Sequence, residues 1–371
     1  MDTHSSPRRA APRHAKRKIW VYVVVAVIVV LGGGGAAYWF GLFDHPTGDG
    51  PIVTDVPTPL PTETLTPMPK ERWALTGVIG DHGLVTERPA LVVKIENAPE
   101  SRPQEGLEDA DIVFEEMVEG GVSRFAAIFH STLPEQIAPI RSVRPMDGPI
   151  TAWTGGLLAF SGGQAQFTSR AENDGLQLIS MDWGADGFSR EPSRDAPHDV
   201  AGDTASFLAQ ADEDHQSSPP QFCAFDTTST GGTAQTSGTA TTTVSVSISS
   251  AAQPTWTWDT ASNMWLRAEG STPAMAASGA QLSTANVLVV DVNVVMLEGT
   301  DAAGTHIPET IVVGQGTGLV ASGGMSAPIT WQKDSETAPW QFFDASGAPL
   351  VLNPGSTWVE LVPSSGSWSV S

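Results

Sequence analysis

The sequence predicts an α/β (α+β) N-terminal domain followed by a β-rich C-terminal domain, with one transmembrane helix ahead of both. Three observations support this prediction. An apolar run without a charged residue extends from Ile19 to Phe43. Segments of helix and strand character alternate over residues 71–215, and short alternating runs separated by Gly, Asn and Asp fill residues 240–371. The chain of 371 residues is 40% hydrophobic, which is enough for two domains with cores.

The N-terminus has the charge pattern of a membrane protein. Residues 1–18 form a basic arm with six Lys or Arg and one acid, whereas the whole chain has a net charge of −22. A run of about 20 apolar residues spans a bilayer, and aromatic residues gather near its ends, as Trp20 and Trp39 do here. The positive-inside rule places the N-terminus in the cytoplasm. The sequence therefore predicts a single-pass plasma membrane protein, anchored by residues 19–43, with its folded domains extracellular.

A cleaved signal peptide is the alternative for the same segment. Its apolar region would be Ile19–Leu31, with a small-residue cleavage site near GGGGAA. Apolar residues continue beyond those glycines to Phe43, which favours a retained signal anchor. The folded part lies outside the cytoplasm in both cases.

A linker is predicted at residues 44–70. It contains seven prolines and six threonines, which exclude a regular helix or a central strand. Such a segment is extended and semi-rigid, and it would hold the folded part away from the membrane.

Within the first domain, PALVVKIEN (89–97) predicts a short apolar strand and residues 106–131 predict a hairpin. VAGDTASFLAQADED predicts a helix with Asp203 as its N-cap. A Ser/Thr/Gly-rich connection follows at residues 216–239. The second domain begins with the alternating strand TTTVSVSISS and a hairpin that turns around Thr260–Asn263. GQGTG (314–318) lacks the context of a dinucleotide-binding loop, so we expect a β-turn there.

The first hairpin holds the most suggestive charges. A two-residue Gly120-Gly121 turn would pair Met117 with Arg124 and would place Arg124 diagonally from both Glu115 and Glu119. One interpretation is a cross-strand network of ion pairs. The other is a site in which the acids orient the arginine toward an anionic ligand. The two glutamates would lie about 13 Å apart along one strand, too far for a glycosidase pair.

These motifs resemble a known family. LVVKIENAPESRPQEGLEDADIVFEEMVEGGVSRFAAIFHS, IAPIRSVRPMD and FSREPSRDAPHD are similar to the N-terminal domain of the YerB-like family of bacterial lipoproteins. The WTWDTASNMWLR hairpin, GQGTG and PGSTWVELVP are similar to its C-terminal domain, so the resemblance covers about residues 75–365. It implies an extracytoplasmic protein of two domains, and it implies no activity.

The chain departs from the family pattern at several positions. Members are often anchored by a lipid on an N-terminal Cys, whereas the one cysteine here, Cys223, lies in PPQFCAFD and is predicted to be a core residue. His198-Asp199 replaces the expected His-Asn, and Ile95-Glu96-Asn97 replaces Ile-Asp-Asn.

The basic residues outside the predicted membrane segment concentrate in the first domain. Nine of 13 lie between Arg88 and Arg194. Two of the arginines are held between Pro139 and Pro145, where proline limits the freedom of the loop. Guanidinium groups bind phosphate or carboxylate through two parallel hydrogen bonds. If the loops converge, they form an anion pocket; if they do not, each arginine forms an ordinary ion pair. The candidate ligand-binding residues are Arg102, Arg124, Arg141, Arg144, Asp147, Arg190 and Arg194.

Candidate catalytic residues are Glu115, Glu119 and His198, which supply the side chains of acid/base chemistry. AFSGG (159–163) approximates the nucleophile elbow of serine hydrolases, but Ala stands where that motif has its first Gly, and only 37 residues separate Ser161 from His198. A tight glycine turn after an apolar segment explains this motif equally well.

The eight histidines are scattered without zinc-type spacing, so we expect no metal site. We likewise expect no cofactor, and we expect no nucleic-acid partner because a basic stripe is missing. Three functions remain open. The favoured one is binding of an anionic envelope ligand, a cell-wall polymer or an envelope protein. The others are a hydrolase or transferase acting on wall polymers, and a structural scaffold.

Overall fold

The computed structural model describes residues 71–83, 85–301 and 303–371. The predicted basic arm, transmembrane helix and linker lie outside the described residues. Within the part that is described, no helix has the length and apolar character needed to span a bilayer.

A 12-stranded mixed sheet is the framework of the molecule, in the order β10-β19-β18-β16-β22-β2-β3-β1-β5-β6, with β17 paired to β16 and β20 paired to β19. The first half of the chain supplies β1 Leu91–Glu96, β2 Ile112–Met117, β3 Ser123–Phe129, β5 Leu157–Phe160 and β6 Gln177–Ser180. The second half supplies β10 Thr239–Ala240, β16 Asn286–Thr300, β17 His306–Ile311, β18 Gly314–Ser322, β19 Met325–Lys333, β20 Gln341–Asp344 and β22 Thr357–Pro363.

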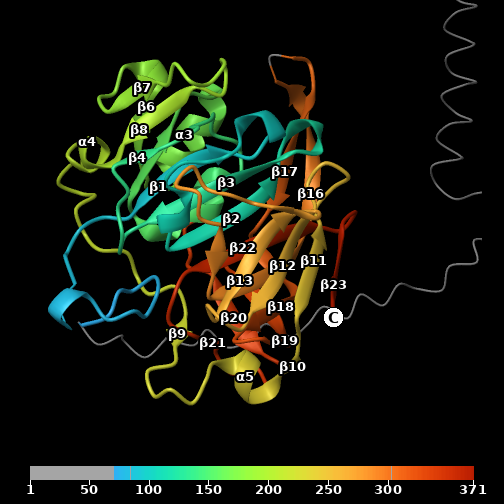
Figure 1. Cartoon of the computed structure of the whole chain (residues 1–371). Helices are drawn as coiled ribbons and strands as arrows, with labels where there is room; N and C mark the ends of the chain where they lie inside the picture. Colours follow the sequence, from blue (N-terminus) through green and yellow to red (C-terminus); the bar gives the residue numbers. More distant parts are fainter. Residues whose placement is uncertain (1–70, 84, 302) are drawn as a thin grey trace, which may run out of the picture. The chain divides into compact units, whose positions relative to one another are not determined.

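The two halves of the chain therefore share one sheet. They join where β2 pairs in parallel with β22, with Ile112 opposite Thr357 and Glu115 opposite Glu360. In Figure 1 the teal strands of the first half lie beside the orange and red strands of the second half in the same sheet. Because side chains alternate along each strand, the sheet buries two separate apolar faces, and most of its strands contribute to both.

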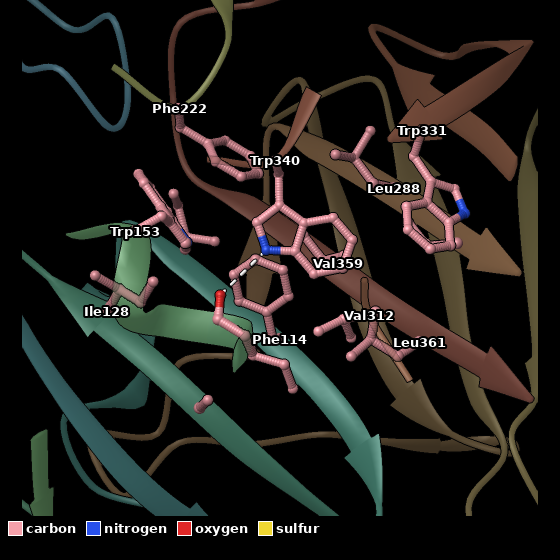
Figure 2. Close-up of a cluster of buried hydrophobic side chains, with 14 of the residues drawn as sticks. Phe114, Ile128, Trp153, Phe222, Leu288, Val312, Trp331, Trp340, Val359 and Leu361 are labelled. Atoms are coloured by element: carbon pink, nitrogen blue, oxygen red, sulfur yellow. Dashed lines mark hydrogen bonds between the residues drawn. The ribbon is translucent and has the colours of Figure 1, made fainter. Parts of the chain in front are cut away.

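Helices and loops cover the first face. They include α2 Asp147–Thr151, α3 Ala165–Asn173 and α5 Thr233–Ser237. Phe114 of β2 stacks on Trp340, with ring centroids 5.5 Å apart, and the indole Nε1 of Trp340 donates a hydrogen bond to the Ile150 carbonyl at 3.1 Å. Figure 2 shows Val359 and Leu361 of β22 in the same cluster. This core therefore also spans both halves of the chain.

The second face is covered mainly by a six-stranded antiparallel sheet, in the order β14-β13-β12-β11-β23, with β15 paired to β13. Its strands are β11 Thr243–Ser247, β12 Pro254–Asp259, β13 Met264–Glu269, β14 Thr272–Pro273, β15 Ser283–Thr284 and β23 Ser367–Val370. A small sheet of β4 Gln136–Ile137, β7 Phe188–Arg190 and β8 Val200–Asp203 lies beside α4 Thr204–Leu208. The strands β9 Ala224–Phe225 and β21 Val351–Leu352 form a separate pair.

Six 3₁₀ turns complete the described elements: η1 Asp81–Gly83, η2 Pro99–Ser101, η3 Leu107–Asp109, η4 Glu119–Gly121, η5 Ala152–Thr154 and η6 Met181–Trp183.

Several local predictions are confirmed. Asp203 caps α4, with its carboxylate accepting the Ser206 N–H at 2.6 Å. Residues 200–203 form β8, and α4 is shorter than predicted because it ends at Leu208. The hairpin around Thr260–Asn263 forms, and Cys223 is buried in the first core. The turn expected at 314–318 is wrong, because those residues are part of β18. Gly318 is suited to that strand, since a Cβ there would lie 2.2 Å from the Val289 carbonyl oxygen.

A polar cluster at the end of β3 fastens the beginning of the described chain to the sheet. His130 packs edge-on against Trp73 at 4.9 Å, and its Nε2 lies 3.1 Å from the Arg88 carbonyl oxygen. Asp111 accepts hydrogen bonds from the backbone N–H groups of His130 and Ser131. Burial, with the nearby Arg88 charge, lowers the pKa of His130 to about 4. The imidazole is therefore neutral in the folded protein at neutral pH.

Because His130 is buried in its neutral form, we expect it to make the free energy of unfolding depend on pH. The substitution His130→Gln is expected to remove that dependence. His130 titrates at 6.5 when unfolded and near 4 when folded, so its contribution to stability is complete above pH 6.5 and is lost as the pH falls toward 4. The loss amounts to about 3 kcal/mol. Urea unfolding of wild type and variant between pH 7 and 4 measures it, because the comparison cancels the other titrating groups. An equal pH slope for the two proteins would show that His130 is not buried in its neutral form.

Candidate functional site

The predicted register of the β2–β3 hairpin is wrong by one residue. Arg124 lies opposite Glu116, and Met117 lies opposite Ser123. The Val118 N–H bonds to the Val122 carbonyl at 2.8 Å, so the turn contains three residues rather than two. Gly120 and Gly121 both have positive φ, at 72° and 76°, which explains the glycine pair.

This shift moves Arg124 to the other face of the sheet, because neighbouring residues in a strand point in opposite directions. Arg124 therefore shares the helix-covered face with Lys94 and Glu116, rather than with Glu115. The predicted diagonal contacts of Arg124 with Glu115 and Glu119 do not form.

A fully buried ion cluster lies at the centre of that face. The Lys94 ammonium contacts Glu116 and donates to Asp147 Oδ1 at 2.7 Å, and all three side chains are inaccessible to solvent. Burial lowers the pKa of Lys94 to about 8, while the neighbouring Asp147 opposes that shift. Asp147 also accepts the backbone N–H of Arg144 at 2.6 Å. The predicted ligand residue Asp147 thus anchors the Arg-rich loop to the sheet.

Next to it lies a group of three arginines, Arg124, Arg141 and Arg144, which we name the arginine cluster. The Arg144 Nε lies 2.7 and 2.8 Å from the two carboxylate oxygens of Glu119. The Arg141 Nε lies 3.2 Å from Glu96 Oε1. The sequence left open whether the arginine loops converge with Arg124 and Arg102. The structure brings Arg124, Arg141 and Arg144 together, while the other predicted arginines have different partners.

Arg124 is the unusual member of the arginine cluster. Only 6% of its surface is exposed, yet among the described residues it has no ion pair. Its Nη1 donates to the Ser142 carbonyl at 3.0 Å. Burial and the positive charges of Arg144 and Arg141 lower the pKa of its guanidinium to about 9. The site therefore holds a buried cation whose charge is not directly neutralised.

His198 joins the cluster through Glu96, at the end of β1. Its Nδ1 lies 2.7 Å from Glu96 Oε2, and the Arg141 Nη1 donates to the Pro197 carbonyl at 2.7 Å. His198 also lines a cleft of about 610 Å³, which we name the His198 cleft. Its titratable lining residues are Glu100, Arg102, Glu105, Glu191, Arg194, Asp195 and His198.

The other predicted arginines are distributed differently. Arg102 and Arg194 line the His198 cleft, but they bond to Glu269 and Glu191 respectively and to nearby backbone carbonyls. Four carboxylates surround them, so this cleft is acidic rather than anion-attracting. Burial, with Glu191 close by, raises the pKa of Glu105. Arg190 pairs with Asp199 at 2.7 Å and lines neither this cleft nor the arginine cluster.

The three candidate catalytic residues do not meet. Glu119 pairs with Arg144, His198 pairs with Glu96, and Glu115 faces the six-stranded sheet on the opposite side. Ser161 of the approximate nucleophile elbow has no hydrogen bond to His198 among the residues described. Its N–H bonds to the Arg141 carbonyl at 3.0 Å. Serine hydrolase chemistry therefore gains no support.

Glu115 belongs to a second buried ion cluster. Arg267 of β13 donates to Glu115 Oε2 at 2.6 Å and lies over the rings of Phe125 and Trp358. Glu360 lies opposite Glu115 in the parallel pairing and accepts the Trp256 indole N–H at 2.8 Å. Burial and the charge of Glu115 raise the pKa of Glu360 well above its usual value. Burial therefore favours the neutral, protonated form of Glu360.

Sequence reasoning missed Lys94, Glu96 and Glu116 as site residues. A signal existed, because Lys94 and Glu96 interrupt the apolar run LVVKIEN at alternate positions and therefore share one face. The pairing of Arg267 with Glu115 carried no such signal, because the two residues lie 152 positions apart along the chain.

Two family models match this chain. The model described as "Protein of unknown function (DUF3048) N-terminal domain" covers residues 75–217, and the one described as "Protein of unknown function (DUF3048) C-terminal domain" covers residues 244–359. "Putative lipoprotein YerB" of Bacillus subtilis (strain 168) is 35% identical over 134 residues, which are 33% of this chain and 39% of the relative. That alignment thus spans well under two thirds of the relative's length.

The crystal structure of the YerB protein from Bacillus subtilis has the same fold. It superimposes with a TM-score of 0.68 at 21% identity, covering 80% of this chain and 99% of the other. The resemblance to the YerB-like family that the sequence motifs indicated is confirmed.

We expect isosteric substitutions of Glu115 and Glu360 to have very different effects on stability. Glu360→Gln retains an acceptor for Trp256 and a donor toward Glu115, so we expect the free energy of unfolding to change by less than about 1 kcal/mol at pH 7. Glu115→Gln removes the carboxylate from a buried guanidinium and is expected to cost about 3–5 kcal/mol. Urea unfolding of both variants measures the difference.

Glu360→Gln is also expected to differ from wild type in how its free energy of unfolding depends on pH. A carboxyl with a raised folded pKa stabilises fully below its unfolded value of 4.5, and this contribution declines as the pH rises through the folded pKa. Glu360→Gln removes that decline. Equal destabilisation by both substitutions at pH 7 would contradict the assignment of the proton to Glu360.

Proposed function

The chain belongs to the DUF3048 family of proteins of unknown function, and from this premise we propose that it binds an anionic ligand of the cell envelope through the arginine cluster. The proposal includes its location: the described residues lie outside the cytoplasm, and residues 19–43 hold the protein at the plasma membrane. The name lipoprotein, given to the Bacillus relative, supports a membrane-anchored extracytoplasmic position. Cys223 is only 3% exposed, so it does not offer a site for a lipid.

The observation that carries the proposal is the state of Arg124. An unpaired buried charge is costly, and a protein that keeps one loses stability unless an anion neutralises it. None of the Nη2 nitrogens of Arg124, Arg141 and Arg144 has a hydrogen-bond partner among the described residues. Their donors therefore remain for an oxyanion such as a phosphate or a carboxylate.

Neighbouring carboxylates prepare the cluster for this role. Glu96 and Glu119 contact the Nε sides of Arg141 and Arg144, which fixes the orientation of each guanidinium. Asp147 holds the backbone of the loop through the Arg144 N–H. A binding site whose side chains are already ordered loses less conformational entropy when its ligand arrives.

A second candidate function is acid/base chemistry in the His198 cleft. Glu96 binds His198 Nδ1, and the Nε2 of His198 has no partner in the described part of the chain. A histidine oriented in this way by a carboxylate can exchange a proton with a substrate. In this alternative the protein is a hydrolase or transferase of wall polymers, and Glu96 takes the role that the sequence assigned to Glu115 or Glu119.

Arg124→Gln tests the proposed function, with Arg190→Gln as the matched control because Arg190 is exposed and ion-paired. We expect Arg124→Gln to weaken binding to anionic cell-wall fractions by about 10- to 100-fold, the loss of one or two charged hydrogen bonds. The same variant is expected to melt at an equal or higher temperature without ligand, since it removes a buried, unpaired charge. Co-sedimentation and thermal unfolding measure the two effects.

Equal binding by wild type, Arg124→Gln and Arg190→Gln would contradict the proposed anion binding and would favour a structural scaffold. Release of products from the same wall fractions, abolished by His198→Ala, would favour the enzyme.

A further inference from the structure

An exposed tryptophan lies beside the arginine cluster. Trp183 is 59% exposed, and it is the one aromatic side chain among the large apolar residues exposed in the described part of the chain. Its ring meets the buried Phe160 edge-to-face, with centroids 5.9 Å apart. The surrounding turn is closed by hydrogen bonds from Gly184 N–H to the Met181 carbonyl and from Ala185 N–H to the Ser180 carbonyl. The indole is thus held in place while much of its surface faces solvent.

Backbone hydrogen bonds connect this turn to the loop of the arginine cluster. The Asp182 N–H bonds to the Ser161 carbonyl at 3.1 Å, and the Ser161 N–H bonds to the Arg141 carbonyl at 3.0 Å. Three chain segments therefore run side by side. Segments bonded in this way lie about 5 Å apart, so the backbones of Asp182 and Arg141 are separated by roughly 10 Å.

Trp183 and the arginines also lie on the same face of the sheet. Phe160, which supports Trp183, belongs to the helix-covered core together with Phe114 and Ala126. The parallel pairing of β1 and β5 ends at Val93 and Ala159, and Lys94 and Phe160 are the next residues of the two strands. One ligand can therefore contact the indole and a guanidinium at the same time.

Asp182 adds a hydrogen-bond acceptor between them. It is exposed, and its carboxylate has no hydrogen-bond partner among the described residues. Gly162 makes room for it, since a Cβ at that position would lie 1.9 Å from Asp182 Oδ2. An aromatic plane stacks on a flat apolar surface, and a carboxylate accepts hydroxyl protons. A sugar ring presents both of these features.

We propose that Trp183 and Asp182 form a saccharide subsite next to the arginine cluster, so that the ligand is a glycan carrying carboxylate or phosphate groups. This inference rests on the proposed function, because it assigns the anionic group of the glycan to the arginines. A nucleic acid would also offer rings and phosphates, but the net charge of −22 disfavours a polyanion of that charge density.

The test uses three soluble probes with the purified protein. A uronic acid oligosaccharide has both rings and carboxylates, a phosphorylated oligosaccharide has both rings and phosphates, and polyphosphate has charge without rings. Trp183→Ala is expected to weaken binding of the preferred acidic oligosaccharide by about tenfold, the loss that follows removal of a stacking contact. It should leave polyphosphate binding unchanged, and Trp183→Phe should restore most of the lost affinity.

Ile79→Ala is the matched control, because Ile79 is similarly exposed, at 56%, and lies near the beginning of the described chain, where it pairs with Arg72. If Trp183→Ala binds every probe as wild type does while Arg124→Gln weakens all of them, the saccharide subsite is refuted and the proposed function stands. If Arg124→Gln changes no affinity, or if wild type binds none of the probes, the proposed function and the subsite both fail.

Discussion

The ion pair between Arg267 and Glu115 holds the molecule together at one point. The guanidinium is 1% exposed and comes from the six-stranded sheet, whereas Glu115 comes from the first half of the chain and lies opposite Glu360 of the second. Aromatic rings surround the charge, with the nearest centroid 5.1 Å away. A charge this deeply buried must meet its partner in good geometry, because a misplaced partner would leave it unpaired. Few other arrangements of the two sheets satisfy that condition.

The same constraint determines where the candidate site lies. Since Glu115 must face the six-stranded sheet, Glu116 must face the helices, where it pairs with Lys94. Arg124 then takes the same side as Glu116, directly across the hairpin. A slip of one residue in β2 would exchange the two faces and dismantle both ion clusters. Structural stability and the orientation of the arginines thus depend on a single register.

The two ion clusters differ in what they leave unsatisfied. Arg267 has carboxylate partners in Glu115 and Glu269, whereas Arg124 has only the Ser142 carbonyl. Both arginines are nearly inaccessible, yet only Arg124 keeps its Nη2 without a partner among the described residues. This contrast separates a cation that joins parts of the fold from one whose unpaired donors carry the proposed function.

The sequence by itself determined the local elements and the family. Alternation placed the strands, Asp203 marked a helix start, and the spacing of polar residues identified the YerB-like pattern. It also placed Arg141 and Arg144 in one short loop, but it left open whether Arg124 joins them. These properties depend on residues close together in the chain, where spacing translates directly into geometry.

Only the tertiary structure decided which charges pair. The hairpin register depended on a three-residue turn that two glycines did not distinguish from a two-residue one. Glu115 pairs with Arg267, 152 positions away along the chain, and His198 pairs with Glu96, 102 positions away. The single sheet shared by both halves arises from the parallel pairing of β2 with β22, about 245 residues apart. Local spacing does not encode contacts of this range, because they depend on how the whole chain packs.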